Sequence, residues 1–211
     1  RTTGMEFASE MMVKAATHGL RIAEVPIHLS RDGRGRPPHL RTFRDGWRHL
    51  RLYLLFSPRW LYLLPGLLLS LLGLVGYVLS MPRMTVFGAT LDLQTLLVSS
   101  MLILVGAQLI LFALATRVFA VYSHMLPDDP KLDRFFTLFT LEKGVLASVA
   151  VGLLGMALLG SVVWEWSSID FGPLDASRTM RAVIPAVTLI TLSVQGVFSS
   201  FFISMLGMRH K

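Results

Sequence analysis

The 211-residue chain has no cysteine, and its acidic residues are few: 13 Asp and Glu stand against 20 Lys and Arg. Without cysteine the chain can form neither a disulfide nor a reactive thiolate. Charge is also missing locally, because four long stretches contain no Asp, Glu, Lys, Arg or His at all. They are Trp60–Pro82, Leu93–Thr116, Gly144–Trp164 and Ala182–Met208, of 23, 24, 21 and 27 residues.

Each charge-free stretch is long enough to cross a bilayer as a helix. A helix rises ~1.5 Å per residue and the hydrocarbon core is ~30 Å thick, so about 20 apolar residues suffice. A single segment in lipid can satisfy its backbone groups only as a helix. The sequence therefore predicts a polytopic membrane protein with four spans. Ionisable residues inside spans usually mark ion or proton pathways, so their absence argues against a coupled transporter.

The basic residues are distributed unevenly between the predicted connections. If the N-terminal segment is cytoplasmic, the loop 117–143 and the C-terminal tail lie on the same side. That side then carries 17 Lys and Arg, and the opposite side carries 3. Because Lys and Arg concentrate in cytoplasmic loops, we expect both termini in the cytoplasm and the protein in the cell (inner) membrane. The basic balance is explained by topology and anionic lipid, so we expect no nucleic-acid partner.

The predicted spans contain glycines and two glutamines. The first span contains Gly66, Gly73 and Gly76, and the third contains Gly152 and Gly155. Glycines let two helix backbones approach closely in a membrane, so we expect these positions at helix contacts. The amides of Gln108 and Gln195 are expected to form hydrogen bonds between helices.

The polar head of the chain predicts one helix and one strand. Thr3 with Glu6 fits a capping box, and the helix is expected to run to His18, with Gly19 in the left-handed position that ends it. Residues 20–29 alternate apolar and polar, which indicates a strand, and Pro26 points to an edge strand. One helix and one edge strand do not make a fold. We therefore expect the last unit of an α/β domain in a longer protein.

A basic loop follows the predicted strand. It contains Arg31, Arg34 and Arg36 among two glycines and two prolines. Guanidinium groups bind phosphate oxygens through two parallel hydrogen bonds, so these arginines are candidates for a phosphate site. Composition supports equally well a solvated cationic loop that touches lipid headgroups.

Residues 40–56 predict an amphipathic helix at the membrane surface. Phe43, Trp47, Leu50 and Leu54 step by four, three and four residues and so form one apolar stripe. A basic helix with aromatic residues on its apolar side lies in the plane of the interface. The predicted membrane-interface residues are Arg41, Phe43, Arg44, Trp47, Arg48 and Arg51.

Several motifs together resemble the C-terminal portion of glycosyltransferase family 2, in the polyprenyl-phosphate branch that includes enzymes similar to dolichyl-phosphate mannose or glucose synthase. The motifs are Gly4–Glu10, Lys14-Ala15, Gly19–Ile27, Phe43–Leu50 and Leu141–Gly144. Gly35 stands where the family's basic loop commonly has Ser, and Arg36 keeps the cation. The resemblance places Arg34 and Arg36, and with them Arg31, near the lipid phosphate or nucleotide phosphate.

The resemblance implies sugar transfer from a nucleoside-diphosphate sugar to a polyprenyl phosphate on the cytoplasmic face. It also implies a divalent cation, Mg or Mn, whose ligands, like the catalytic carboxylate, are expected upstream of Arg1. We therefore assign no catalytic residue and no metal ligand within this chain. Glu6 and Glu10 lie one helical turn apart, and capping and the helix dipole explain them better than a catalytic pair.

The predicted fold class is a mainly α membrane protein: four transmembrane helices preceded by an interfacial helix and the last helix–strand unit of a truncated α/β glycosyltransferase domain. The predicted boundaries are 1–30 for that domain end, 31–58 for the basic loop and interfacial helix, and 59–211 for the spans. Expected partners are the lipid bilayer, polyprenyl phosphate and a nucleoside-diphosphate sugar, with homo-oligomerisation left open. The alternative is a non-enzymatic four-span protein that moves or presents lipid-linked sugars.

Overall fold

The computed structural model describes residues 7–28, 33, 41–82, 85–86, 88–123 and 140–207. Four helices in this part of the chain are long and apolar enough to cross a membrane: Arg59–Ser80, Leu93–Tyr122, Leu141–Ser167 and Ala176–Gly207, of 22, 30, 27 and 32 residues. The four-span prediction is confirmed. The first span combines a short π-helical segment, η1 (Arg59–Leu63), with α3 (Leu64–Ser80).

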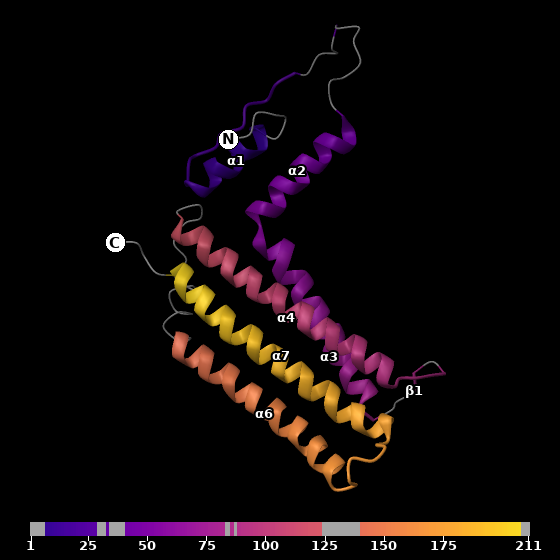
Figure 1. Ribbon diagram of the computed structural model, residues 1–211. Helices are drawn as coiled ribbons and strands as arrows, with labels where there is room; N and C mark the ends of the chain where they lie inside the picture. The colour runs from indigo at the N-terminus through magenta and orange to yellow at the C-terminus, as the bar shows by residue number, and fades with distance from the viewer. Residues whose placement is uncertain are drawn as a thin grey trace.

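The other three spans are α4 (Leu93–Tyr122), α6 (Leu141–Ser167) and α7 (Ala176–Gly207). They lie with α3 in one row, in the order α3, α4, α7, α6 (Figure 1). The row is built from two antiparallel hairpins, α3 with α4 and α6 with α7, that meet where α4 packs against α7. Two-residue strands, β1 (Thr85–Val86) and β2 (Ala89–Thr90), pair antiparallel in the connection between α3 and α4.

Glycines allow the close approach of the helices within each hairpin. A Cβ atom on Gly73 would lie 2.7 Å from the carbonyl oxygen of Ser99, and one on Gly155 would lie 2.9 Å from that of Ala186. A real Cβ atom does not approach backbone this closely, so only glycine fits. Gly66, Gly76 and Gly152 also face an adjacent helix at such distances, which confirms the expected contacts.

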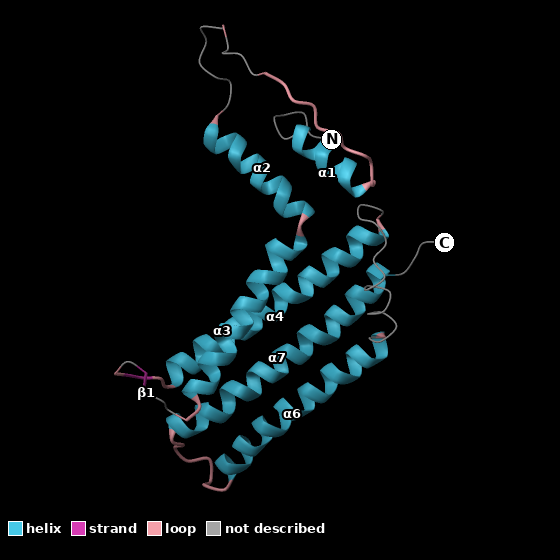
Figure 2. Cartoon of the chain, turned by 180° about the vertical axis from the view of Figure 1, so that it is seen from behind, coloured by secondary structure: helices cyan, strands magenta, loops and turns pink. Residues whose placement is uncertain are grey.

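An apolar cluster fills the junction of the two hairpins at one end. Ala115, Val118 and Val121 of α4 pack there against Ile203 of α7. This end of the bundle lies nearest to the polar head of the chain (Figure 2).

The polar head contains two helices, α1 (Phe7–Thr17) and α2 (Thr42–Phe56). Gly19 has a φ of 64°, and the N–H groups of Gly19 and Leu20 donate to the carbonyls of Ala16 and Ala15. This double hydrogen bond around a left-handed glycine ends α1 as expected. The proposed capping pair, Thr3 and Glu6, lies outside the described residues.

The predicted strand over residues 20–29 is wrong for its described part. Residues 20–28 form neither a helix nor a paired strand. A strand is stabilised by hydrogen bonds to a neighbouring strand, and no described segment pairs with these residues. The alternating pattern therefore produces an exposed stretch in which Val25 and Ile27 are 76% and 80% accessible.

Candidate membrane-surface site

The helix α2 begins with a hydrogen bond that its own sequence supplies. The carboxylate of Asp45 accepts a hydrogen bond of 2.8 Å from the backbone N–H of Arg41, and the Asp45 N–H donates to the Arg41 carbonyl over the same distance. The carboxylate satisfies the N–H of Arg41, which has no partner within the helix, and the second bond is the first backbone hydrogen bond of the helix itself. Asp45 is buried in doing so, and its negative charge is favourable at this end of the helix dipole.

The apolar stripe of α2 is largely exposed in the described part of the chain. Phe43 is 95% accessible, Trp47 61% and Leu50 50%, and Leu54 is half-buried. Arg41, Arg44 and Arg51 are exposed, and Arg48 is half-buried. A helix that presents Phe and Trp beside three arginines has the composition of an interfacial helix. The predicted membrane contact of these residues stays a prediction.

The chain turns sharply between α2 and the first span, so that α2 runs across the direction of the bundle helices in the view of Figure 1. The helix α2 ends at Phe56, and Ser57 departs from helical geometry with φ −129° and ψ 77°. Pro58 follows, and a residue before proline is disfavoured in the helical region. The π-helical segment follows, and its Tyr62 packs edge-on against Phe112 of α4 with 6.2 Å between ring centroids. The segment leads directly into α3.

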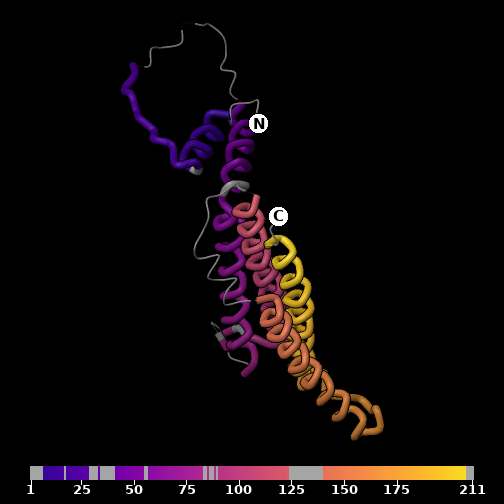
Figure 3. The backbone as a smooth tube through the Cα atoms, turned by 90° about the vertical axis from the view of Figure 1, so that its left-hand side faces the viewer, coloured from indigo at the N-terminus to yellow at the C-terminus, as the bar shows by residue number. Residues whose placement is uncertain are grey.

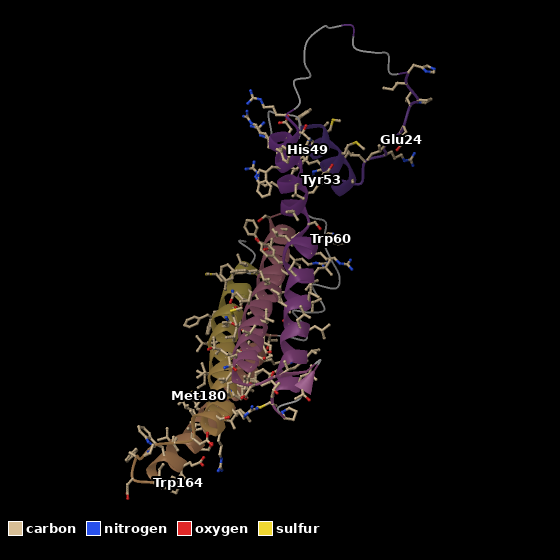
Figure 4. The ribbon with its side chains drawn as sticks, turned by 90° about the vertical axis from the view of Figure 1, so that its right-hand side faces the viewer. Glu24, His49, Tyr53, Trp60, Trp164 and Met180 are labelled. Carbon is tan, nitrogen blue, oxygen red and sulfur yellow. The ribbon has the colours of Figure 1, made fainter. Side chains whose placement is uncertain are left out.

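Polar contacts join α1 to α2. The Tyr53 hydroxyl donates a hydrogen bond of 3.2 Å to Ser9 Oγ, and Ser9 Oγ lies 3.2 Å from Nδ1 of His49 (Figure 4). Which atom donates between Ser9 and His49 depends on the tautomer of the imidazole ring. Figure 3 shows α1 beside α2, above the first span. The stripe that faces α1 thus differs from the apolar stripe of α2.

The opposite end of the bundle is joined by Arg181. Its guanidinium donates to the carbonyls of Ser80 and Met81, at 2.8 and 2.7 Å, and forms an ion pair with Asp92. These groups belong to the end of α3 and the start of α4, so one α7 side chain holds both helices of the other hairpin. A second contact lies deeper, where Ser100 of α4 hydrogen-bonds Thr188 of α7.

The arginines of the predicted phosphate site, Arg31, Arg34 and Arg36, lie outside the described residues. Gly33, which stands among them, is described and exposed. Within the described ranges, no three His, Cys, Asp or Glu side chains converge in a way that could hold a metal ion. These residues therefore do not offer a ligand set for the expected divalent cation.

Sequence reasoning missed the residues that join the helices to one another. The charge-free stretch predicts a fourth span that starts after Arg181, at Ala182. Instead α7 begins at Ala176, because the Asp175 carboxylate accepts hydrogen bonds from the N–H groups of Ser177 and Arg178. The signal in the sequence is Asp175 itself, because Asp is a preferred residue at the N-cap of a helix. By contrast, Oε1 of Gln195 is buried without a hydrogen-bond partner in the described part of the chain, so the expected bond fails for that atom.

Two comparisons with known proteins bear on the class of this membrane bundle. Residues 114–207 match the family model described as glycosyltransferase family 2 C-terminal transmembrane region. This match includes the end of α4 and the whole of α6 and α7.

The chain is also 35% identical, over 214 aligned residues, to the low-salt glycan biosynthesis hexosyltransferase Agl6 of Haloferax volcanii. This alignment covers 98% of the chain and 48% of the relative, so the chain spans about half the length of the curated relative it matches. No solved structure shows significant similarity to the chain.

Proposed function

We propose that this chain is the membrane part of a hexosyltransferase that moves a sugar from a nucleoside-diphosphate sugar to a polyprenyl phosphate on the cytoplasmic face. The observation that carries the proposal is the similarity over nearly the whole chain to a hexosyltransferase. A non-enzymatic protein that presents lipid-linked sugars would need the same spans. It would not need the segment 7–28, which the alignment to the hexosyltransferase also includes.

In this proposal α2 sets the height of the reaction at the membrane surface. The acceptor has a long apolar chain in the bilayer and a phosphate in the headgroup layer, so the sugar must be delivered at that layer. Phe43 and Trp47 would anchor α2 at that depth, and the exposed arginines beside them would face anionic headgroups. The polar contact through Ser9 would keep α1, and the chain before it, close to this surface.

The basic loop would then hold the acceptor phosphate. Arg34 and Arg36, and with them Arg31, stand in sequence between α1 and the surface helix. A guanidinium can donate two hydrogen bonds to one phosphate group and so orient it. A phosphate oxygen held in this way can attack the sugar carbon that carries the nucleoside diphosphate. The bond from that carbon to the diphosphate oxygen breaks, and the nucleoside diphosphate leaves with the bonding electrons. Positioning lowers the entropy cost of the attack.

The test uses the full-length protein with polyprenyl phosphate as acceptor. Arg34→Ala and Arg36→Ala should each lower turnover about tenfold to a hundredfold, because a lost charge-assisted contact costs about 1.5–3 kcal/mol. Lys at either position should restore part of the activity, because an ammonium group cannot make the two-point contact.

The matched control is Arg41→Ala, which removes an arginine on the surface helix and should cost much less. If all three substitutions reduce turnover alike, and anionic lipid restores it, the loop only contacts headgroups. If the full-length protein transfers no sugar to any polyprenyl phosphate, the proposed reaction itself is wrong.

A further inference from the structure

A groove of about 580 Å³ lies between α4 and α7, in the part of the junction that is nearer to Arg181. Eight of the ten residues that line it are apolar. Figure 4 shows Met180, one of its lining residues, at the end of the bundle away from His49 and Tyr53. The groove thus lies in the half of the membrane opposite the surface helix.

The two polar residues of the groove need no further partner. Ser100 hydrogen-bonds Thr188, and the Thr188 hydroxyl donates to the carbonyl of Ile184 at 2.6 Å. Because Thr188 gives its hydrogen to Ile184, Ser100 gives its own to Thr188. Both hydrogens are used, so the groove offers no free donor and favours an apolar occupant.

The length of the groove fits one leaflet. Its α4 side runs from Leu97 to Leu104, and seven residues of helix rise about 11 Å. Half of a ~30 Å hydrocarbon core is about 15 Å. The groove thus covers most of the depth of the leaflet on the Arg181 side, parallel to the helices and therefore to the lipid chains.

The lining favours a lipid chain over a second helix. Where helices of this chain pack closely, glycine on one meets serine on the other, as Gly76 meets Ser99 and Gly152 meets Ser193. The groove contains no glycine and instead includes Met101 and Met180, whose long flexible side chains adapt to irregular partners. A chain of methylene or isoprene units can follow such a surface without the small residues that a helix contact requires.

We propose that this groove binds one hydrocarbon chain of a membrane lipid from the leaflet on the Arg181 side. This hydrocarbon chain would fill space between the two hairpins. The hairpins are also joined by the Arg181–Asp92 ion pair, the Ser100–Thr188 hydrogen bond and the apolar cluster around Val118. A lipid chain held between α4 and α7 exchanges more slowly than the lipids that surround the bundle.

The experiment places a photoactivatable benzophenone amino acid in the membrane-embedded protein at Met101, in the groove, or at Leu153, on α6. Both side chains are accessible, at 55% and 66%, and Leu153 is not part of the groove. The protein is extracted, washed extensively with detergent and irradiated, and lipid adducts are measured by intact-protein mass spectrometry. We expect adducts to persist at Met101 and to be lost at Leu153.

Two substitutions on α7 complete the design. Val187→Trp fills the groove and should abolish the adduct at Met101, whereas Val194→Trp lies outside it and should not. The two valines are matched, at 49% and 50% accessible. Equal loss of adducts at Met101 and Leu153 would overturn the proposal, and so would a cross-link between two protein chains at Met101, which would show that a second copy covers the groove. If Val187→Trp fails to fold, the comparison of lipid adducts at Met101 and Leu153 still tests the proposal.

Discussion

At the scale of single residues, Arg181 joins the two hairpins through three contacts. It is 16% accessible, and it satisfies two carbonyls at the end of α3, where the helix dipole favours a cation. Its other partner, Asp92, is the residue just before α4, where the dipole favours an anion. One half-buried arginine therefore complements two helix ends at once.

Arg181→Met should destabilise the bundle, since it removes the hydrogen bonds that the guanidinium donates. The carbonyls of Ser80 and Met81 then lose this donor. We expect the free energy of unfolding to fall by about 1.5–3 kcal/mol. Thermal unfolding in detergent micelles measures the effect. The control is Arg178→Met: Arg178 is 79% accessible, its distance to Glu165 is 3.4 Å, and such exposed pairs contribute about 0–1 kcal/mol. Equal losses in the two variants would contradict the role given to Arg181.

Gly73→Ala tests the close approach of α3 and α4. The added methyl would meet the backbone of Ser99 at 2.7 Å, and backbone cannot move aside as a side chain can. We expect a loss of about 1–3 kcal/mol in the free energy of unfolding, as for other overpacked sites. Gly160→Ala is the control, because nothing lies within 4 Å of the new atom and alanine favours the helix by up to ~1 kcal/mol. A stable Gly73→Ala protein would show that the helices can separate at little cost.

At the scale of elements, the sequence predicts best those segments whose stability comes from their own pattern. The spans and α2 are examples, because length, missing charge and a 3.6-residue stripe decide them locally. The exposed stretch 20–28 shows the limit, since an alternating pattern becomes a strand only beside another strand. The apolar run does not predict the start of α7, because the helix begins before that run, where the Asp175 carboxylate accepts a hydrogen bond from Ser177.

A peptide of residues 38–58 should bind anionic vesicles and become helical on them, with binding that weakens as salt is added. Each Arg near an anionic surface contributes ~1 kcal/mol. Circular dichroism and vesicle sedimentation measure the two effects. A peptide with Arg44, Arg48 and Arg51 replaced by Gln should lose most of its affinity for anionic vesicles but keep its weak affinity for neutral ones. If the original peptide binds both kinds of vesicle equally, the arginines contribute little.

At the scale of the whole molecule, the order of the four helices could not be predicted from the sequence. Each span is apolar around most of its circumference, so no single stripe marks its neighbour. The glycines and the two glutamines predict helix contacts without indicating the partner helix. Which glycine meets which serine depends on the paired hairpins, as with Gly76 and Ser99. The row α3, α4, α7, α6 is thus a result of packing between elements. The phosphate site stays a prediction, because its arginines lie outside the described residues.

The orientation of the bundle can be tested directly because the chain has no native cysteine. The ends of α3 and α6 lie at the same side of the row, opposite α1 and α2 (Figure 1). With 17 of the 20 Lys and Arg on the side of α1, this opposite side should face outward. Single cysteines at the exposed positions Thr90 and Ser168 should therefore react with an impermeant thiol reagent added to intact cells, whereas one at His18 should react only after the cells are opened.

A cysteine at Asp129, which lies outside the described residues, extends the same test to the loop between α4 and α6. Both ends of that loop lie on the side of α1, because α4 ends and α6 begins there (Figure 1). It should therefore behave like His18. Labelling of His18 and Asp129 in intact cells, with none at Ser168, would invert the bundle. Surface helix and basic loop would then face away from the cytoplasm, where nucleoside-diphosphate sugars are made, and the proposed reaction would lose its donor. Labelling of Thr90 without Ser168 would instead contradict the four-span count, since those two positions lie on opposite sides if only one of α4 and α6 crosses.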